Sequence, residues 1–281
     1  MTDASLRALE DLDALLSVDH PVLTYDIGPG FTPPAYALGA LAEGGAVAVQ
    51  RRSDRGHPGL AVIGAATAVR RLLLSEEIGD LVRLRGLTHV SVPRAAFEHV
   101  ADVHDWAGGG EWDWMWTTTT LPTLPHESDI EIVDDAAAAE LVEFLRRANP
   151  RTHGEPFARP DQLWVTLRDD RALVACGSWD LATSGIPVLT GIAVDPARRG
   201  EGYGAAITAY LTRRAVSTCG ACTLGMFADN LTARLLYHRL GYRTGAQWSS
   251  RWFAHGADGT NGPDRARPIG RPPGRRTAAA P

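Results

Sequence analysis

The segment from Pro187 to Gly204 constrains the fold more than any other part of the sequence. It starts with an apolar run that ends at Val194, and this run predicts a β-strand buried on both faces. Pro196 ends the strand, and two arginines and three glycines follow. Residues 202–217 then place apolar side chains at four-residue spacing, which predicts an amphipathic helix. A strand that leads through a glycine-rich turn into a helix is typical of an α/β protein.

The flanking elements extend this pattern. Residues 129–133 predict a strand, and residues 134–148 predict a helix that opens with acidic residues. Two strand-like runs form a hairpin through Asp169 and Asp170. The predicted order is strand, helix, three strands, helix, strand, helix and strands, which makes a mixed α/β layer. The other predicted ranges are strands at 163–168, 171–180, 221–227 and 242–253, and a helix at 231–240 that starts at Asp229 or Asn230 and ends at Gly241.

Composition divides the chain into three parts. A polar run rich in Thr and Pro at residues 117–128 predicts a domain boundary, so we expect domains at residues 1–120 and 128–255. Residues 256–281 are mostly Gly, Pro, Ala and Arg, which predicts a mobile tail. Patterns in the first domain predict strands at 21–26, 46–50, 60–63, 88–92 and 112–119 and helices at 65–74 and 94–103.

The two domains share short similarities. Gly64 and two alanines open a helix as Gly204 and two alanines do, and residues 88–116 have nearly the element spacing of residues 223–252. Gene duplication explains these matches, and so does chance similarity between Ala-rich helices.

Charge and hydropathy exclude several functions. The 28 basic residues, all arginine, are outnumbered by 33 acidic residues, so the charge of -5 argues against binding to nucleic acid. A lysine nucleophile is excluded because the sequence has no lysine. No apolar run reaches the ~18 residues that span a bilayer. The first ten residues carry acidic side chains where a signal peptide needs a basic one, so we expect a cytoplasmic protein without membrane contact.

The three cysteines fit a reducing compartment better than a disulfide framework. Cys219 and Cys222 form a C-x-x-C, but they lie between a helix end and a strand rather than at a helix start, where the dipole lowers a thiol pKa. No second pair of Cys or His residues completes a zinc tetrahedron. We therefore expect a structural role for both cysteines and no bound metal.

The glycine turn has the chemistry of an anion site. Glycines allow positive φ angles, so several backbone N–H groups can converge on one anion, and the following helix adds its dipole. Arg198 and Arg199 add positive charge. The expected ligand is a phosphate or a diphosphate.

A dinucleotide is the competing ligand. Gly200, Gly202 and Ala205 satisfy G-x-G-x-x-A, and Asp229 stands where a ribose-binding acid is expected. The dinucleotide pattern begins directly at the end of its strand, however, whereas residues 196–199 intervene here. A Walker loop is excluded because the lysine is absent.

A second segment makes the pattern specific. The helix at 231–240 starts after Asn230, carries Ala233 and Tyr237 on one face and stops at Gly241. Together with Arg199-x-x-Gly202-x-Gly204, it resembles the GNAT superfamily of acyl-CoA-dependent N-acyltransferases over residues 129–253. The resemblance implies a GNAT-like mixed α/β fold. The first domain lacks the Arg-x-x-Gly-x-Gly turn, so we expect a degenerate GNAT-like repeat or an auxiliary domain that shapes the acceptor site or a dimer contact, and thus two tandem halves.

The resemblance also implies a mechanism. Acetyl-CoA is the expected cosubstrate, an amine attacks its thioester directly, a backbone N–H at or near Ile192 stabilises the oxyanion, and Tyr237 protonates the thiolate. The residues that the resemblance assigns to the cofactor are Ile192, Ala193, Val194, Arg199, Gly200, Glu201, Gly202, Tyr203, Gly204, Ala205 and Asn230.

The general base stays open at this point. Related enzymes place a carboxylate on the strand that here spans residues 187–194, and this strand has none. Asp195 follows it but equally suits a turn before proline. The loop at 149–159 offers His153 and Glu155, either of which can accept a proton directly or through water. Ser178 and Trp179 are candidates for the acceptor pocket.

The sequence therefore predicts an N-acetyltransferase that acts on a small-molecule or peptide amine. Two alternatives remain. A non-catalytic acyl-CoA sensor needs the anion turn but not Tyr237, and an NAD-dependent oxidoreductase binds NAD in place of coenzyme A.

Overall fold

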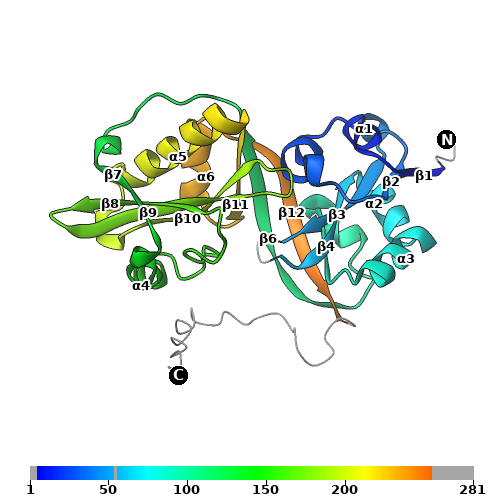
Figure 1. Cartoon of the computed structure of the whole chain (residues 1–281). Helices are drawn as coiled ribbons and strands as arrows, with labels where there is room; N and C mark the ends of the chain where they lie inside the picture. Colours follow the sequence, from blue (N-terminus) through cyan, green and yellow to red (C-terminus); the bar gives the residue numbers. More distant parts are fainter. Residues whose placement is uncertain (1–4, 54–55, 255–281) are drawn as a thin grey trace, which may run out of the picture.

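The computed structural model describes residues 5–53 and 56–254, so the predicted tail at 256–281 lies outside the described residues. Its strands form one twelve-stranded sheet in the order β1-β2-β3-β4-β5-β12-β6-β11-β10-β9-β8-β7. Figure 1 shows this sheet twisting through the whole molecule, with β6 and β12 crossing its centre. The predicted mixed α/β fold is confirmed.

The second half follows the predicted element order closely. The apolar stripe of Ile207, Leu211 and Ala215 is completely buried, as its spacing predicts. The β8–β9 turn falls at Asp170 and Arg171, one residue later than predicted, where both residues have positive φ. The elements are β7 (Ile130–Val133), α4 (Ala138–Ala148), β8 (Leu163–Asp169), β9 (Ala172–Leu181), β10 (Pro187–Val194), α5 (Tyr203–Cys219), β11 (Cys222–Phe227), α6 (Leu231–Arg239) and β12 (Arg243–Phe253).

The first half departs more from the sequence patterns. The predicted strand at 21–26 is wrong: Leu23–Ile27 forms a π-helical turn. This turn directs Val22, Leu23 and Ile27 into one core, whereas a strand would alternate them between two faces. The elements are β1 (Leu6–Leu9), α1 (Leu12–Leu16), β2 (Ala35–Leu38), β3 (Ala46–Arg52), β4 (Pro58–Gly64), α2 (Ala66–Leu73), α3 (Glu76–Arg85), β5 (His89–Pro93) and β6 (Trp106–Thr117).

Several elements of the first half escape the sequence patterns altogether. β1 and β2 have only four residues each, too few for a clear alternation. α3 follows α2 after only Leu74 and Ser75, and no sequence pattern predicts it, because the predicted helix ends at residue 74. The helix predicted at 94–103 is only a 3-10 segment, Arg94–His99.

The two halves have the same topology around a central exchange of strands. From the centre outward, the order β12-β5-β4-β3-β2-β1 repeats as β6-β11-β10-β9-β8-β7. In each half the same pair is parallel, β4 with β5 and β10 with β11, and the other neighbours are antiparallel. β6 pairs with β11 of the second half, and β12 pairs with β5 of the first. One sheet contains strands from both sides of residues 117–128, so the division into domains stays a prediction.

Helices cover both faces of the second half. α5 and α6 pack on one face, where Ile207, Leu211 and Tyr237 share a core with Met115 of β6. α4 packs on the other face against Trp164 of β8. Figure 1 shows α5 and α6 on one side of strands β8 to β11 and α4 on the other.

The predicted double-sided burial of residues 187–194 is wrong in detail. Along β10 buried residues alternate with half-exposed ones, whereas β4 is buried continuously from Gly59 to Ile63. β10 therefore has accessible positions that the equivalent strand of the first half does not have.

Candidate active site

The glycine turn after β10 leaves backbone N–H groups open at the start of α5. Asp195 accepts a hydrogen bond from the Ala197 N–H at 2.9 Å and shapes the first part of the turn. Gly200 and Gly202 adopt φ angles of 89° and 94°, and a side chain in this region is strained. Gly202 caps α5 without a side-chain hydrogen bond. The first-turn amides of this 17-residue helix thus stay available to an anion.

Gly204 and Tyr203 hold this helix start in place. A Cβ at Gly204 would lie 3.3 Å from Cγ2 of Val194, so glycine lets α5 approach the end of β10. Tyr203 is buried, and its ring packs 4.6 Å from that of His126, centroid to centroid. The Tyr203 side chain therefore fixes the helix, and its backbone is the part that faces the turn.

The arginines of the turn are engaged within the protein. Arg198 donates to Asp169 at 2.6 Å, to Glu201 at 2.9 Å and to the Tyr203 hydroxyl at 2.6 Å. The Arg198 guanidinium lowers the pKa of the Glu201 carboxyl, and Glu201 and Asp169 raise the pKa of Arg198. Arg199 donates to the Ala148 carbonyl at 2.8 Å and ties the turn to the end of α4. The predicted contact of Arg199 and Glu201 with cofactor stays a prediction.

β10 separates from β11 directly before the turn. The two strands pair only at Val188 with Thr223 and Leu189 with Leu224. The register with β9 then shifts between Thr190 and Ala193, and Gly191 has a φ of 63°. This bulge frees the β11-facing backbone of residues 190–194, which includes the predicted Ile192, Ala193 and Val194.

Sequence reasoning missed Asn149, which braces this bulge. Its amide nitrogen donates to the Ile192 carbonyl at 3.2 Å. The residue follows the last turn of α4, where asparagine is common as a helix end, so no local signal marks the contact. Gly191 was missed as well: a Cβ there would lie 2.6 Å from the Trp164 ring, so this position requires glycine.

Tyr237 and Asn230 occupy α6 as predicted. Asn230 accepts from the Ala233 N–H at 3.1 Å and is the helix cap, while the side chain stays exposed. Tyr237 is 8 % exposed, and burial raises the pKa of its phenol to about 12. Its hydroxyl makes no hydrogen bond within residues 5–53 and 56–254. The phenol is thus a protonated group with a free donor.

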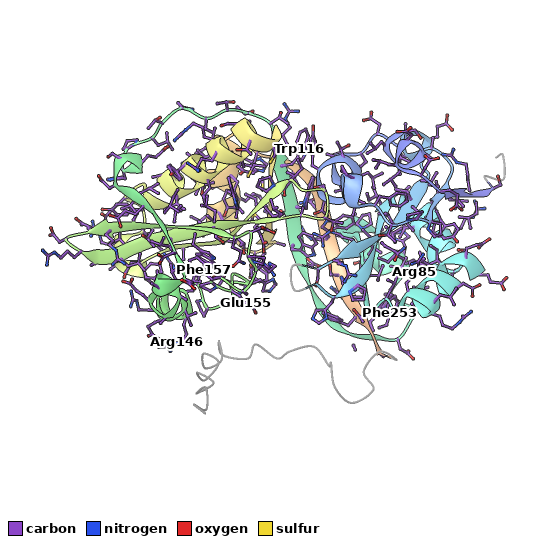
Figure 2. The ribbon with its side chains drawn as sticks, in the orientation of Figure 1. Arg85, Trp116, Arg146, Glu155, Phe157 and Phe253 are labelled. Atoms are coloured by element: carbon purple, nitrogen blue, oxygen red, sulfur yellow. The ribbon has the colours of Figure 1, made fainter. Side chains whose placement is uncertain are left out.

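The loop at 149–159 bridges the separated strands. A Cβ at Gly154 would lie 2.8 Å from the Cα of Gly191, so the loop rests on the bulge. His153 contacts the Phe227 ring edge to face at 5.6 Å, at the end of β11. Figure 2 shows Glu155 and Phe157 on this loop beside α4, on the side of the sheet away from α5. His153 and Glu155 therefore approach the strand pair from the face opposite to Tyr237.

Ser178 and Trp179 do not line one pocket together. Ser178 is completely buried and donates to the Thr190 carbonyl at 3.3 Å. Trp179 packs on the core beneath α5. Neighbouring strand residues point to opposite faces, which separates the two side chains.

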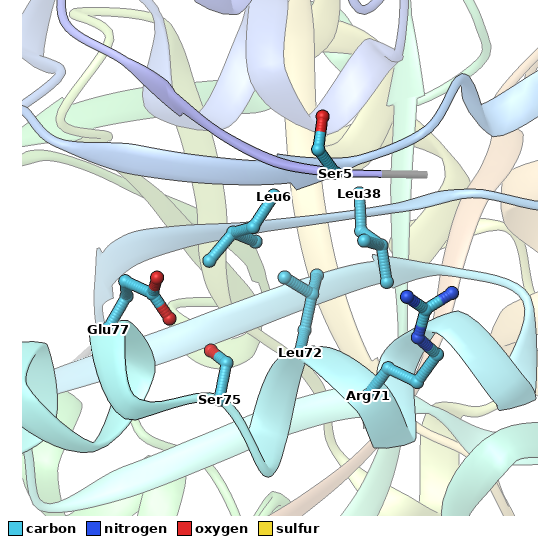
Figure 3. A pocket seen from close by; sticks show the side chains of 7 residues that line it. All are labelled: Ser5, Leu6, Leu38, Arg71, Leu72, Ser75 and Glu77. Atoms are coloured by element: carbon cyan, nitrogen blue, oxygen red, sulfur yellow. The ribbon is translucent and has the colours of Figure 1, made fainter. Parts of the chain in front are cut away.

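Two cavities lie in the first half, away from the glycine turn. One has a volume of about 250 Å³, lies between β1, β2 and the helices α2 and α3, and is shown in Figure 3. The other, about 460 Å³, adjoins α3 and Phe253. The residues around the first cavity are Ser5, Leu6, Leu38, Arg71, Leu72, Ser75 and Glu77. Neither cavity contains a predicted site residue.

Residues 5–53 and 56–254 contain no group of three His, Cys, Asp or Glu side chains placed to hold a metal ion. Burial raises the pKa of the Cys222 thiol to about 12. Among the same residues, no helix is long and apolar enough to cross a membrane.

Comparisons with known proteins give a family match for one region of the chain and a shared fold. Residues 130–242 match the sequence model of the acetyltransferase (GNAT) family. A solved protein from Drosophila, 14 % identical, aligns over 89 % of this chain and 98 % of its own with a TM-score of 0.51, which shows a shared fold across both halves. No curated protein matches the sequence.

Two bacterial structures also align. A GCN5-related N-acetyltransferase from Kribbella flavida is 19 % identical and covers 75 % of this chain and 87 % of its own, with a TM-score of 0.47. A GNAT-family acetyltransferase from Colwellia psychrerythraea is 14 % identical and covers 89 % and 99 %, with a TM-score of 0.47.

Proposed function

Residues 130–242 form a GNAT-family acetyltransferase domain, and from this premise we propose that the protein transfers an acetyl group from acetyl-CoA to a primary amine. The observation that carries the proposal is the junction of β10 and α5. A strand that leaves its neighbour at Thr190 is followed directly by a turn whose N–H groups have no side-chain cap. The first feature exposes a backbone edge, and the second offers an anion site.

Each part of the cofactor matches one of these features. The diphosphate binds the N–H groups of the turn from Gly200 to Ala205, where the helix dipole favours negative charge. The pantetheine arm runs along the freed backbone of residues 192–194, and Asn230 contacts it from α6. Because the Arg198 charge is already balanced by Asp169 and Glu201, the backbone supplies most of the attraction.

The chemistry is a direct displacement. The neutral amine attacks the thioester carbonyl, a C–N bond forms and the C–S bond breaks. A backbone N–H at the bulge, at or near Ile192, stabilises the oxyanion. The proton of the amine goes to a base, and the phenol of Tyr237 gives its proton to the departing thiolate. A pKa of about 12 keeps this phenol protonated at neutral pH, as an acid requires.

His153 and Glu155 are the proposed bases. His153 has the stronger geometric support because its ring contacts Phe227 beside the separated strands. Glu155 is exposed on the same loop and can act through water. The free state of all three cysteines agrees with the proposed cytoplasmic location. A dimer contact through the first half remains a prediction.

Binding and turnover test the proposal separately. Acetyl-CoA is expected to raise the melting temperature, whereas NAD at the same concentration leaves it unchanged. A screen of small amines, amino acids and peptides should find an acceptor that releases free coenzyme A. Stabilisation by acetyl-CoA without release from any amine would instead identify a sensor, and stabilisation by NAD alone would overturn the proposal.

A further inference from the structure

Gly225 occupies an unexpected place in the sheet. It lies in the middle of β11, whose pairing with β6 runs from Cys222 to Phe227 without a register shift. Its φ lies outside the left-handed region, so the backbone does not require glycine. A Cβ there would meet only the Trp112 ring at 3.5 Å, which is ordinary contact. Gly225 follows Leu224, the last residue of β11 that pairs with β10, and it is solvent exposed.

A glycine within a strand costs stability and is often found at a site that a ligand approaches closely. The open sheet face around Gly225 consists of this residue, Trp112 and Phe227 beside it, and Val188 and Thr190 on β10. The last four are all half exposed. This face is opposite to Leu224 and Met226, which pack in the core with Tyr237.

Contacts between neighbouring elements enclose this open face at both of its ends. At one end the β9–β10 hairpin docks onto the first half, where the Ser184 hydroxyl donates to the Tyr25 carbonyl at 2.7 Å. Tyr25 in turn stacks on Trp116 at 4.8 Å, at the upper end of β6 in Figure 2. At the other end lie Phe227 and His153.

Charged groups around the open face are already paired. Arg51 lies 4.9 Å from the Trp112 ring and is bound to the buried Asp26 at 2.5 Å. Arg151 lies 4.1 Å from the Phe227 ring and is bound to Asp229 at 2.8 Å. A carboxylate or phosphate on the ligand would have to break one of these pairs. Aromatic rings and methyl groups are the surfaces that remain.

We propose that this open face binds the acceptor and that the acceptor is an amine carrying a flat aromatic group, which lies over Gly225 beside the neighbouring rings of Trp112 and Phe227. This inference rests on the proposed acetyl transfer, because it places the amine next to His153 and the β10 bulge. The first half thereby contributes Trp112 to acceptor specificity, and glycine at 225 provides the room.

The experiment compares 2-phenylethylamine with ethylamine. We expect kcat/KM with acetyl-CoA to be at least tenfold higher for 2-phenylethylamine. Gly225→Leu should lower that value at least tenfold and leave ethylamine turnover, acetyl-CoA affinity and the melting temperature nearly unchanged. Gly225→Ala, whose Cβ meets only ordinary contact, should give a smaller loss in the same direction. Gly79→Leu on the exposed side of α3 is the matched control and should change neither of the two kcat/KM values nor the acetyl-CoA affinity.

Calorimetric titration of 2-phenylethylamine in the presence of coenzyme A separates the two proposals. Binding that Gly225→Leu abolishes, in a protein that acetylates no amine, would support the aromatic site and contradict acetyl transfer. Equal turnover of both amines, or equal loss of both in Gly225→Leu, would overturn the aromatic site while acetyl transfer stands. The aromatic site is also overturned if 2-phenylethylamine neither binds nor reacts.

Discussion

The two halves share one topology, but β10 of the second half is bulged and half exposed where its counterpart β4 is continuously buried. In the first half β4 pairs with β5 at residues 59–61, and beyond this point Val62, Ile63 and Val92 fill the space with buried side chains. In the second half β10 leaves β11 at the same stage but bulges and stays half exposed. Topology alone therefore does not make the site.

The segments that follow the equivalent strands also differ between the two halves. β4 runs through Gly64 and Ala65 directly into α2. β10 is followed by residues 195–202, which form the turn with positive-φ glycines before α5. β5 leads into the short 3-10 segment Arg94–His99, whereas β11 leads into α6 with Tyr237. One glycine-rich turn and one helix therefore distinguish the second half from the first.

The largest expected effect concerns the helix that the first half lacks. Tyr237→Phe should lower kcat by roughly 100-fold or more, because a general acid contributes about 10²–10⁴ in rate. The acetyl-CoA dissociation constant should hardly change, since the phenol acts on the leaving thiolate. Steady-state kinetics and calorimetry measure the two quantities.

Tyr242→Phe is the matched control for this prediction. Its ring lies 5.8 Å from that of Tyr237, and its hydroxyl is hydrogen bonded to Thr212 at 2.7 Å. Removing that hydroxyl should cost stability of about 1 kcal/mol and spare kcat. Equal loss of kcat in both variants would contradict the acid role.

Introducing an aspartate at the helix start that follows β10 and at the one that follows β4 tests the difference between the two connections. Gly202→Asp should weaken acetyl-CoA binding about 100-fold, because a carboxylate at the start of α5 occupies the amides and repels the diphosphate. Ala65→Asp, at the cap of α2, should leave acetyl-CoA affinity unchanged and stabilise the protein by about 1 kcal/mol. Calorimetric titration and thermal unfolding measure both. The comparison fails if the two variants bind acetyl-CoA alike.

The next largest expected effect is on the free energy of unfolding, and it concerns a buried carboxylate that connects the two halves. Asp113 of β6 is fully buried and accepts hydrogen bonds from Arg94 of the first half at 2.6 Å and from Nε of Arg234 of α6 at 3.0 Å. Asp113→Asn should lower the free energy of unfolding by roughly 2 kcal/mol, because two guanidinium groups lose their counter-charge. Glu111→Gln, at a half-exposed neighbour of Arg94, should change it by under about 0.5 kcal/mol. Denaturant titrations that gave equal losses would remove the special role of Asp113.

The smallest expected effect is a loss of folding stability at alkaline pH, caused by the buried phenol of Tyr237 in the second half. Tyr237 has a pKa of about 12 in the folded protein, against about 10 when unfolded. Its stabilising contribution is complete below pH 10 and is lost as the pH rises toward 12, which amounts to about 1.4 kcal/mol at pH 11. Burial of Tyr242 and Cys222 acts in the same direction.

Tyr237→Phe isolates this contribution. The variant should lose less stability than the wild type between pH 9 and pH 11, measured by chemical denaturation at each pH. Identical pH dependence in the two proteins would show that the phenol titrates normally.

Sequence patterns describe the second half well because its signals are local. Pro196, Gly202 and Gly241 mark boundaries that the structure places where predicted, and the apolar spacing of α5 fixes its buried face. In the first half, by contrast, four-residue strands and a π-helical turn leave no periodic signal.

The candidate site could be predicted from the sequence only in part, for a related reason. The turn and Tyr237 have recognisable spacing, but Asn149, the β10 bulge and the open position at Gly225 depend on contacts between distant segments. The pairing of β6 with β12 joins residues far apart in sequence, so no local pattern predicts it.

The exchange of β6 and β12 also sets the order in which the molecule can be completed during synthesis. β5 emerges early from the ribosome, yet its outer edge is covered only by β12, the last strand. An uncovered edge strand is prone to pair with other chains. The first half therefore has to wait, with an open edge, until translation has almost reached the end of the described chain.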